Sequence, residues 1–345
     1  MTGQDPWAPF EGKYKIHEES REFGRLLIAS GFKSLSELGV EKAKQVVSTQ
    51  FVALSGEVDF DGEEKEIIIP SPYTLEGIPV SVYKPTSAPE VPAIMVYFHG
   101  GGWVLGSRKT HEVTLKIIAR DSGAIVVNVE YRLMPIPDEP YAPLDDAEVV
   151  TKWLMENKEA VGGKPNSKFG VGGDSSGGQL AIGTTNEVSG LDFQILVYPL
   201  ADTSLSQDTV REFKQVPGLD ENDIKFYLHH GYSQIPDLLT NPRVNGMART
   251  NTATSPPALI ILAELDLLRG GGIDYAEKLR AAGVKVQLEV IRGVPHAFFT
   301  LRKIFETTTA QAYDYIVKFL KQFQKCSSDG KPDHTVFCCC RFFLR

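Results

Sequence analysis

The sequence predicts an α/β fold in which a mostly parallel central sheet of about eight strands carries helices on both faces and a helical cap. Apolar runs of strand length alternate with segments of helical pattern along the chain, which is the order that parallel strands with helical crossovers require. The 345 residues are enough for one large domain of this kind and a cap. A G-x-S-x-G segment at 173–177 lies between a strand-like run and a helix, as expected at the edge of such a sheet.

The expected elements follow one another in a regular order. Residues 18–52 have an amphipathic helical pattern and make up most of an N-terminal helical cap segment at 1–55. The main domain is expected at 56–325, with its last helix at 308–324. It begins with two antiparallel edge strands and continues with six core strands, at 65–69, 80–84, 93–98, 124–131, 168–172, 193–198, 257–263 and 285–291.

The stretch 202–254 interrupts this alternation between the sixth and seventh strands. It contains polar turns and a helical stretch at 224–232, so we expect it to join the N-terminal helices in a cap over an apolar pocket. Trp103 and Tyr227 are the predicted substrate-binding residues. The other candidates for the pocket lining are Phe226, Leu228, Leu238 and Leu239, and packing within the cap is an equally good explanation for them.

The segment 173–177 supplies the predicted nucleophile, Ser175. A strand, a G-x-S-x-G turn and a helix together force a serine hydroxyl out of a sharp bend. Gly173 and Gly177 leave room where side chains would clash with the bent backbone. Taken alone, the motif also fits an ordinary Gly/Ser loop, so the partners that a reactive serine needs decide between the two.

A glycine-rich segment follows the apolar run 93–98. His99-Gly100-Gly101-Gly102-Trp103 is the type of loop whose backbone N–H groups bind the oxyanion in lipases and esterases. The N–H of Ser176, the residue after the nucleophile, is a further expected donor. Both motifs follow strand-like runs in the expected order, which favours a site over an unrelated glycine turn.

His296 is the predicted general base, because a neutral imidazole can take the serine proton and later return it. It is the one histidine of seven that we expect to close a strand and open a C-terminal helix. Asp266 is the predicted acid, since it follows the buried run 257–263 and can fix the imidazole tautomer. Glu264 and Asp274 are its rivals, and Asp274 is expected one turn into the next helix.

With these residues assembled, the chain resembles the hormone-sensitive lipase family of α/β-hydrolases, and within it the arylacetamide deacetylase-like and microbial carboxylesterase-like members. The similarity covers roughly residues 40–325. The matching stretches are 99–103, 131–135, 145–146, 173–178, 198–199, 264–266 and 293–298. The resemblance implies the α/β-hydrolase fold, a catalytic domain at 56–325 and specific roles. These are Ser175 as nucleophile, Asp266 and His296 as its partners, and Gly100, Gly101 and Ser176 as oxyanion donors.

The chain departs from the family pattern next to the predicted acid. Leu267 stands where the family usually has proline, and Gly270–Gly272 stands where an acidic pair is common. Each glycine inside a helix costs about 1 kcal/mol relative to alanine, so we expect a looser helix start there. The helix after the nucleophile, expected from 179 to about 188, is shorter than the family norm.

The expected activity is hydrolysis of short- to medium-chain or aryl carboxylic esters through an acyl-enzyme, with no cofactor and no metal. An arylacetamide-type amidase or deacetylase is the first alternative, because the same triad cleaves both bonds. A non-catalytic small-molecule receptor on the same fold is the second. Plant gibberellin receptors resemble this family but lack the catalytic histidine, whereas His296 is present here.

Composition narrows the expected partners. The net charge of −8 argues against nucleic acid, which requires a basic surface. No apolar run reaches the roughly 18 residues that a membrane span needs, and the polar N-terminus lacks a secretory signal, so we expect a cytoplasmic protein without a stable membrane anchor. The four cysteines all lie in the last twenty residues, and 326–345 is expected to be a disordered tail. A homodimer is compatible with the sequence.

Overall fold

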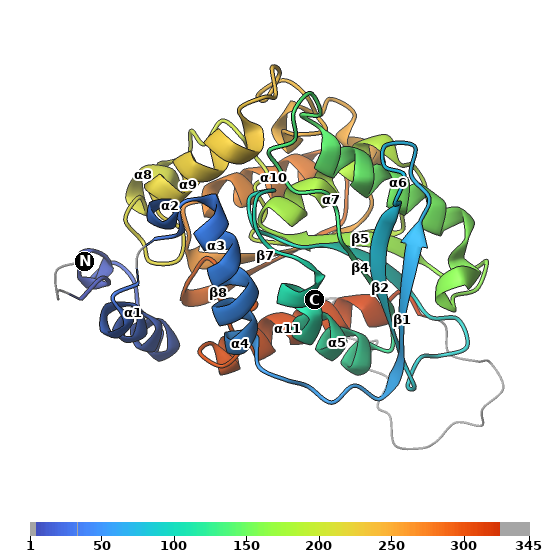
Figure 1. The fold of residues 1–345 in the computed structure, drawn as a ribbon, viewed down its shortest axis with the longest axis horizontal. Coiled ribbons are helices and arrows are strands. Elements are labelled where there is room, and N and C mark those ends of the chain that lie inside the picture. The colour runs from blue at the N-terminus through green and yellow to red at the C-terminus, as the bar shows by residue number, and fades with distance from the viewer. Residues whose placement is uncertain (1–4, 33, 325–345) are drawn as a thin grey trace, which may run out of the picture.

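The computed structural model describes residues 5–32 and 34–324. Their centre is an eight-stranded sheet in the order β1-β2-β4-β3-β5-β6-β7-β8 (Figure 1). β2 runs antiparallel to both of its neighbours, and the remaining neighbouring pairs are parallel. The strands are β1 (Gly62–Ile69), β2 (Ile78–Pro85), β3 (Ile94–Phe98), β4 (Ile125–Val129), β5 (Phe169–Asp174), β6 (Phe193–Val197), β7 (Ala258–Leu265) and β8 (Val286–Pro295). The predicted fold class and all eight predicted strands are confirmed.

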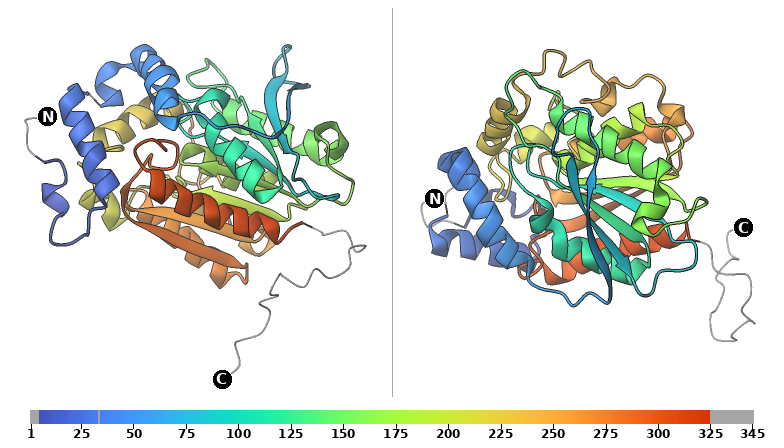
Figure 2. Two further views of the ribbon diagram at one scale, coloured as in Figure 1. Left: turned by 90° about the horizontal axis from the view of Figure 1, so that it is seen from below. Right: turned by 45° about the vertical axis from the view of Figure 1, so that its right-hand side comes forward.

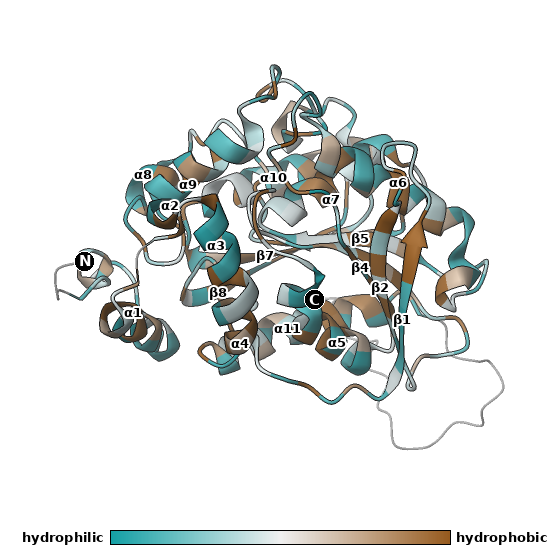
Figure 3. Ribbon diagram, viewed as in Figure 1, coloured by the Kyte–Doolittle hydropathy of each residue, from teal (hydrophilic) through white to brown (hydrophobic). Residues whose placement is uncertain are grey.

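Helices cover both faces of the sheet. α5 (Arg108–Ser122) and α11 (Glu306–Lys321) pack on one face, and α6 (Ala142–Glu156), α7 (Ser176–Glu187) and α10 (Arg269–Ala281) lie on the other (Figure 1). Every residue of the five strands β3 to β7 is buried, as expected for parallel strands covered on both sides. α5, α6, α10 and α11 carry both polar and apolar residues, because one side of each faces solvent (Figure 3), whereas α7 is buried from Ser176 to Thr185.

The N-terminal segment is broken into short helices. α1 (Glu18–Ser30), α2 (Leu35–Leu38), α3 (Val40–Val46) and α4 (Val52–Ser55) gather at one end of the molecule, with a π-type turn at Val47–Phe51 (Figure 2). A helical pattern over 18–52 was predicted as one stretch. The breaks fall at Gly31 and Gly39, whose positive φ values of 59° and 73° cannot continue a right-handed helix.

The insertion between β6 and β7 contains α8 (Asp208–Glu212) and α9 (Glu221–Tyr227), followed by a π-type turn at Leu228–Tyr232. α9 contacts α2 of the N-terminal segment. The backbone N–H of Ser36 donates a hydrogen bond of 3.1 Å to Asp223 Oδ1 across this contact. Two segments far apart in the sequence therefore adjoin.

Two expectations for helices are corrected. His296 does not open a helix, because β8 continues to Pro295, a turn follows, and α11 starts only at Glu306. The helix after the nucleophile begins at Ser176 rather than at 179, so it is longer than expected at its N-terminus. Asp274 lies in a helix, as predicted.

The glycines after Asp266 allow close packing. α10 already begins at Arg269 and includes Gly270–Gly272. A Cβ atom on Gly272 would lie 2.5 Å from Leu262 Cδ2, so glycine lets this helix approach β7. The predicted C-terminal tail falls outside the described residues. Within the described ranges, no helix combines the length and apolar character that crossing a bilayer would require.

Candidate active site

Ser175 occupies a sharp turn between β5 and α7, with φ 55° and ψ −121°. A non-glycine residue at positive φ costs about 1–3 kcal/mol and persists only where its surroundings hold it. The two neighbouring glycines make this possible. A Cβ atom on Gly173 would lie 2.2 Å from the carbonyl oxygen of Gly177, and one on Gly177 would lie 2.0 Å from that of Phe98. The strand–turn–helix context that the motif predicts is present.

The structure brings Ser175, His296 and Asp266 together. His296 Nε2 lies 2.9 Å from Ser175 Oγ, and His296 Nδ1 lies 2.7 Å from Asp266 Oδ2. An ionised carboxylate only accepts, so Nδ1 carries the proton and Nε2 is left to accept from the serine hydroxyl. The Asp266 side chain is fully buried and its Oδ1 accepts the backbone N–H of Leu268 at 2.9 Å. The arrangement can move a proton from Ser175 to His296.

The two rival carboxylates point elsewhere. Glu264 lies within β7, and its oxygens accept from the guanidinium of Arg292 at 2.7 Å and from the N–H of Gly293 at 2.8 Å. Glu264 therefore stabilises the C-terminal end of β8, and His296 is the residue that directly follows this strand. Asp274 accepts a hydrogen bond from Gln207 at 3.1 Å. Neither carboxylate contacts the imidazole, which leaves Asp266 as its partner.

Tyr198 is a site residue to which the sequence analysis gave no role. It directly follows β6, is almost fully buried, and its ring centre lies 4.2 Å from that of the His296 imidazole. The two rings are in contact, with an angle of 44° between their planes. The signal was available, since Tyr198-Pro199 is one of the stretches that match the hormone-sensitive lipase family.

The glycine loop differs from the prediction at Gly100. The N–H of Gly100 donates a hydrogen bond to Asp174 Oδ1 at 3.0 Å. Because this N–H already has an acceptor, it does not point to an oxyanion. The N–H of Gly102 donates to the Ser176 hydroxyl at 2.8 Å. Ser176 is the first residue of α7, and the N–H groups of a first helical turn have no acceptor within the helix. The sequence motif alone does not show which glycine N–H of the loop donates to the Asp174 carboxylate.

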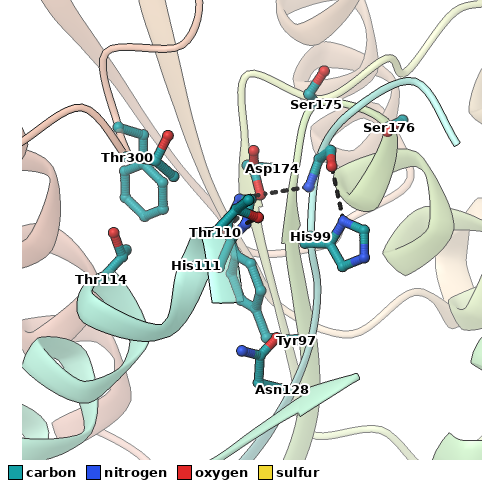
Figure 4. A network of polar contacts seen from close by, with 12 residues as sticks. Tyr97, His99, Thr110, His111, Thr114, Asn128, Asp174, Ser175, Ser176 and Thr300 are labelled. Carbon is teal, nitrogen blue, oxygen red and sulfur yellow. Dashed lines mark hydrogen bonds and ion pairs between the residues drawn. The ribbon is translucent and has the colours of Figure 1, made fainter. Parts of the chain in front are cut away.

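Asp174 is the centre of a buried polar network behind the glycine loop (Figure 4). Its Oδ1 accepts from the Tyr97 hydroxyl at 3.0 Å and lies 2.9 Å from His111 Nε2, a close contact that lacks the alignment of a hydrogen bond. Burial acts to raise the pKa of Asp174, but the facing His111 imidazole and the Tyr97 hydroxyl outweigh it and lower the pKa. Asp174 is therefore ionised at neutral pH and ties β3, β5 and α5 together. His111 has no motif around it, so its contact with Asp174 could not be predicted from the sequence.

His99 supports the loop from the other side. Its Nδ1 donates to the carbonyl oxygen of Gly100 at 2.8 Å, and its ring stacks on Tyr131 with centres 4.2 Å apart. Burial, with a smaller contribution from His111, lowers the pKa of His99 to about 3. His99 is therefore neutral at physiological pH and acts as part of the scaffold.

The two predicted substrate-binding residues have different surroundings. Tyr227 lies over the glycine loop, since a Cβ atom on Gly102 would meet Tyr227 Cδ1 at 2.1 Å, and it lines the cavities next to Ser175. Trp103 is fully buried and stacks on Tyr232 with ring centres 4.3 Å apart. It lines none of the cavities found next to Ser175 among the described residues, so its prediction as a contact residue is not supported. Trp103 instead packs against Tyr232 of the insertion.

Comparison with known families identifies the family to which the chain belongs. The family described as having the alpha/beta hydrolase fold matches residues 95–300, a span that contains Ser175, Asp266 and His296. The chain therefore belongs to the α/β-hydrolase family.

Several similar proteins are named as ester hydrolases. The chain is 34% identical over 239 residues to the ethyl acetate hydrolase of Pseudomonas putida, a match that covers 66% of this chain and 74% of that protein. It is 38% identical over 222 residues to carboxylesterase NlhH of Mycobacterium tuberculosis, covering 62% and 69% of the two chains. A crystal structure of a thermostable esterase from Pseudomonas putida ECU1011 superposes with a TM-score of 0.82 at 27% identity, over 90% of this chain and 98% of the other.

Proposed function

We propose that this protein is a serine carboxylesterase that hydrolyses small-molecule carboxylic esters through an acyl-enzyme. The observation that carries the proposal is the continuous hydrogen-bonded path from Ser175 through His296 to Asp266, with steps of 2.9 and 2.7 Å. The esterase names of its relatives support the same activity.

In the first half of the reaction, Ser175 Oγ attacks the carbonyl carbon of the ester while its proton passes to His296 Nε2. Asp266 stabilises the imidazolium that forms. The bond between the carbonyl carbon and the alcohol oxygen then breaks, and His296 gives its proton to that oxygen. The alcohol leaves, and the acyl group stays on Ser175.

In the second half, water takes the place of the alcohol. His296 accepts a proton from the water as its oxygen attacks the acyl carbon, and Ser175 regains its proton when the carboxylic acid departs. The net reaction converts one ester and one water into one acid and one alcohol. These two reactants and products balance, so the reaction consumes nothing else.

The oxyanion is assigned to the backbone N–H groups of Gly101 and Ser176, because the N–H of Gly100 is bonded to Asp174. Each such donor typically lowers the barrier by about 3 kcal/mol. The Ser176 hydroxyl accepts the N–H of Gly102 and thereby joins the glycine loop to the nucleophile turn. Of the three donors expected from the sequence, Gly100 is therefore left out.

Turnover of p-nitrophenyl acetate by the wild type and by Ser175→Ala tests the proposal. We expect the variant to lose all enzymatic turnover and to lose labelling by a fluorophosphonate, which should map to Ser175 in the wild type. Retained turnover in a folded Ser175→Ala protein would remove Ser175 from its role. An anilide with the same acyl group tests the amidase alternative, which predicts a kcat/KM comparable to that of the ester despite the lower intrinsic reactivity of the amide.

The sequence-based expectations of a cytoplasmic location and of a homodimer stay predictions. Fractionation of the producing cells and the mass of the purified protein in solution test them directly.

A further inference from the structure

Two cavities meet at Ser175. The first, here the histidine-side cavity, is lined by His296 together with Tyr198, Gly218, Ala297 and Thr300. The second, here the cap-side cavity, is not lined by His296. Its apolar lining comes mainly from the insertion and from the loop after β7, and consists of Leu200, Leu205, Leu219, Ile224, Tyr227, Leu228, Tyr232 and Leu268. Both reach the nucleophile, so an ester bound at Ser175 can place one of its halves in each.

The position of His296 decides which half goes where. His296 Nε2 must give its proton to the alcohol oxygen, so this oxygen has to lie within hydrogen-bond reach of the imidazole. The alcohol therefore starts in the cavity that His296 lines. The acyl group is bonded to the same carbonyl carbon but must leave the imidazole free, which directs it to the cap-side cavity.

The two cavities differ in size. The cap-side cavity has a volume of about 30 Å³. One water molecule takes roughly 10–15 Å³ of such volume, so the space holds about two or three heavy atoms. An acetyl or propionyl group fits, whereas a longer acyl chain would have to displace cap side chains such as Leu228.

The histidine-side cavity adjoins a larger apolar chamber. Its own volume is about 90 Å³, and it shares Leu35, Phe51, Gly218 and Ala297 with a chamber of about 230 Å³ beneath the N-terminal helices. That chamber is lined largely by apolar side chains, including Phe23, Leu27, Phe32, Leu54, Leu301 and Ile304. Burial of a CH₂ group is worth about 0.8 kcal/mol, so an apolar alcohol gains binding energy there.

We propose that the preferred substrates are esters of a short acyl group, acetyl or propionyl, with a bulky apolar alcohol. The inference rests on the proposed esterase function and adds the direction in which the ester is bound. Specificity for the acid is then set by the insertion, and specificity for the alcohol by the N-terminal helices.

A matrix of esters tests this directly. Acetate, butyrate and octanoate esters of ethanol, hexanol and cyclohexylmethanol keep the leaving alcohol primary and aliphatic, so its acidity changes little along the series. At constant alcohol, we expect kcat/KM to fall about 100-fold from acetate to octanoate. At constant acetate, we expect it to rise at least about tenfold from ethyl to cyclohexylmethyl, from the added CH₂ burial.

Two variants localise the effects. Leu228→Ala should enlarge the cap-side cavity and raise the octanoate-to-acetate ratio of kcat/KM about tenfold without changing the alcohol preference. Leu27→Trp should fill the chamber and remove the cyclohexylmethyl advantage without changing the acyl ratio. Should Leu228→Ala fail to fold, Ile224→Ala opens the same cavity from α9.

The outcomes separate this inference from the proposed function. Octanoate turned over as fast as acetate, or Leu228→Ala altering the alcohol preference alone, would overturn the assignment while fluorophosphonate labelling of Ser175 keeps the esterase proposal standing. Loss of labelling and of all ester turnover in the wild type would overturn both.

Discussion

Two histidine–aspartate pairs lie near the nucleophile, and their distances alone do not distinguish them. His296 and Asp266 are 2.7 Å apart, and His111 and Asp174 are 2.9 Å apart. The difference lies in the second nitrogen of each imidazole. His296 Nε2 reaches Ser175 Oγ at 2.9 Å, whereas His111 Nδ1 meets the Thr110 hydroxyl at 2.8 Å.

This difference shows that a buried pair does not define a catalytic base. His296 has one nitrogen held by a carboxylate and the other free for a proton transfer. The nitrogens of His111 face Thr110 and Asp174, and neither reaches Ser175. The second pair has a structural role. Asp174 Oδ1 also accepts a hydrogen bond from the N–H of Gly100 and so positions the glycine loop.

The largest expected effect comes from removing the base. His296→Gln should lower kcat/KM for p-nitrophenyl acetate about 10⁵-fold, because Ser175 then has no group to take its proton. His111→Gln is the matched control on the other pair and should cost about tenfold through the glycine loop. Similar losses in the two variants, with both proteins folded by circular dichroism, would contradict the division of roles.

The next effect concerns the acid. Asp266→Asn should lower kcat about 10⁴-fold, since an amide no longer holds the reactive tautomer of His296. Glu264→Gln is its control, because this neighbouring carboxylate bonds Arg292 and Gly293 rather than the imidazole. We expect Glu264→Gln to lower the free energy of unfolding by about 1–3 kcal/mol and to keep kcat within about tenfold. A larger kcat loss in Glu264→Gln than in Asp266→Asn would reverse the assignment.

A smaller effect is expected from the second aspartate. Asp174→Ala should lower kcat about 10²-fold with little change in KM, because the loop that carries an oxyanion donor loses its anchor. Asp174→Asn keeps an acceptor oxygen for Gly100 and Tyr97 and should recover about tenfold of this loss. A rise in KM without a fall in kcat would instead place Asp174 in substrate binding.

The smallest effect is a change in the pH dependence of stability. The pKa of His99 is about 3 in the folded protein, so between pH 3 and 6.5 the unfolded chain binds a proton that the folded chain does not. Stability should therefore fall as the pH drops through this range, by up to about 1.4 kcal/mol per pH unit from this residue.

Urea unfolding of the wild type and of His99→Gln at several pH values measures that contribution. The variant should have a shallower slope above about pH 4.5, where Asp174 stays ionised in both states and adds nothing. Equal slopes in the two proteins would mean that His99 takes up its proton in the folded state.

The strands and the nucleophile turn could be predicted from the sequence, because they depend on the hydrophobic pattern and the motifs of short local segments. The eight strands follow from apolar runs with glycine- and polar-rich breaks, and the turn at Ser175 follows from Gly173 and Gly177. The carboxyl ends of parallel strands share one edge, so placing Asp266 after β7 and His296 after β8 also followed.

The remaining features depend on contacts between distant segments. The hydrogen bond from the Gly100 N–H depends on the orientation of the Asp174 side chain. The spacing of residues in the sequence does not determine that orientation. His111 lies on α5 with no motif around it, and only the folding of α5 beside the end of β5 brings it to Asp174. Trp103 is apolar and follows the glycine loop, but the stacking on Tyr232 that buries it involves the insertion.

Trapping of the acyl-enzyme tests most directly that Ser175, rather than another group, carries the reaction. The protein is mixed with p-nitrophenyl acetate, quenched in acid within milliseconds, digested and mapped by mass spectrometry, beside His296→Gln as control. We predict a single acetyl group on Ser175 in the wild type and none in the variant. An acetyl group on another residue, or rapid turnover with Ser175 unmodified at every quench time, would contradict the account.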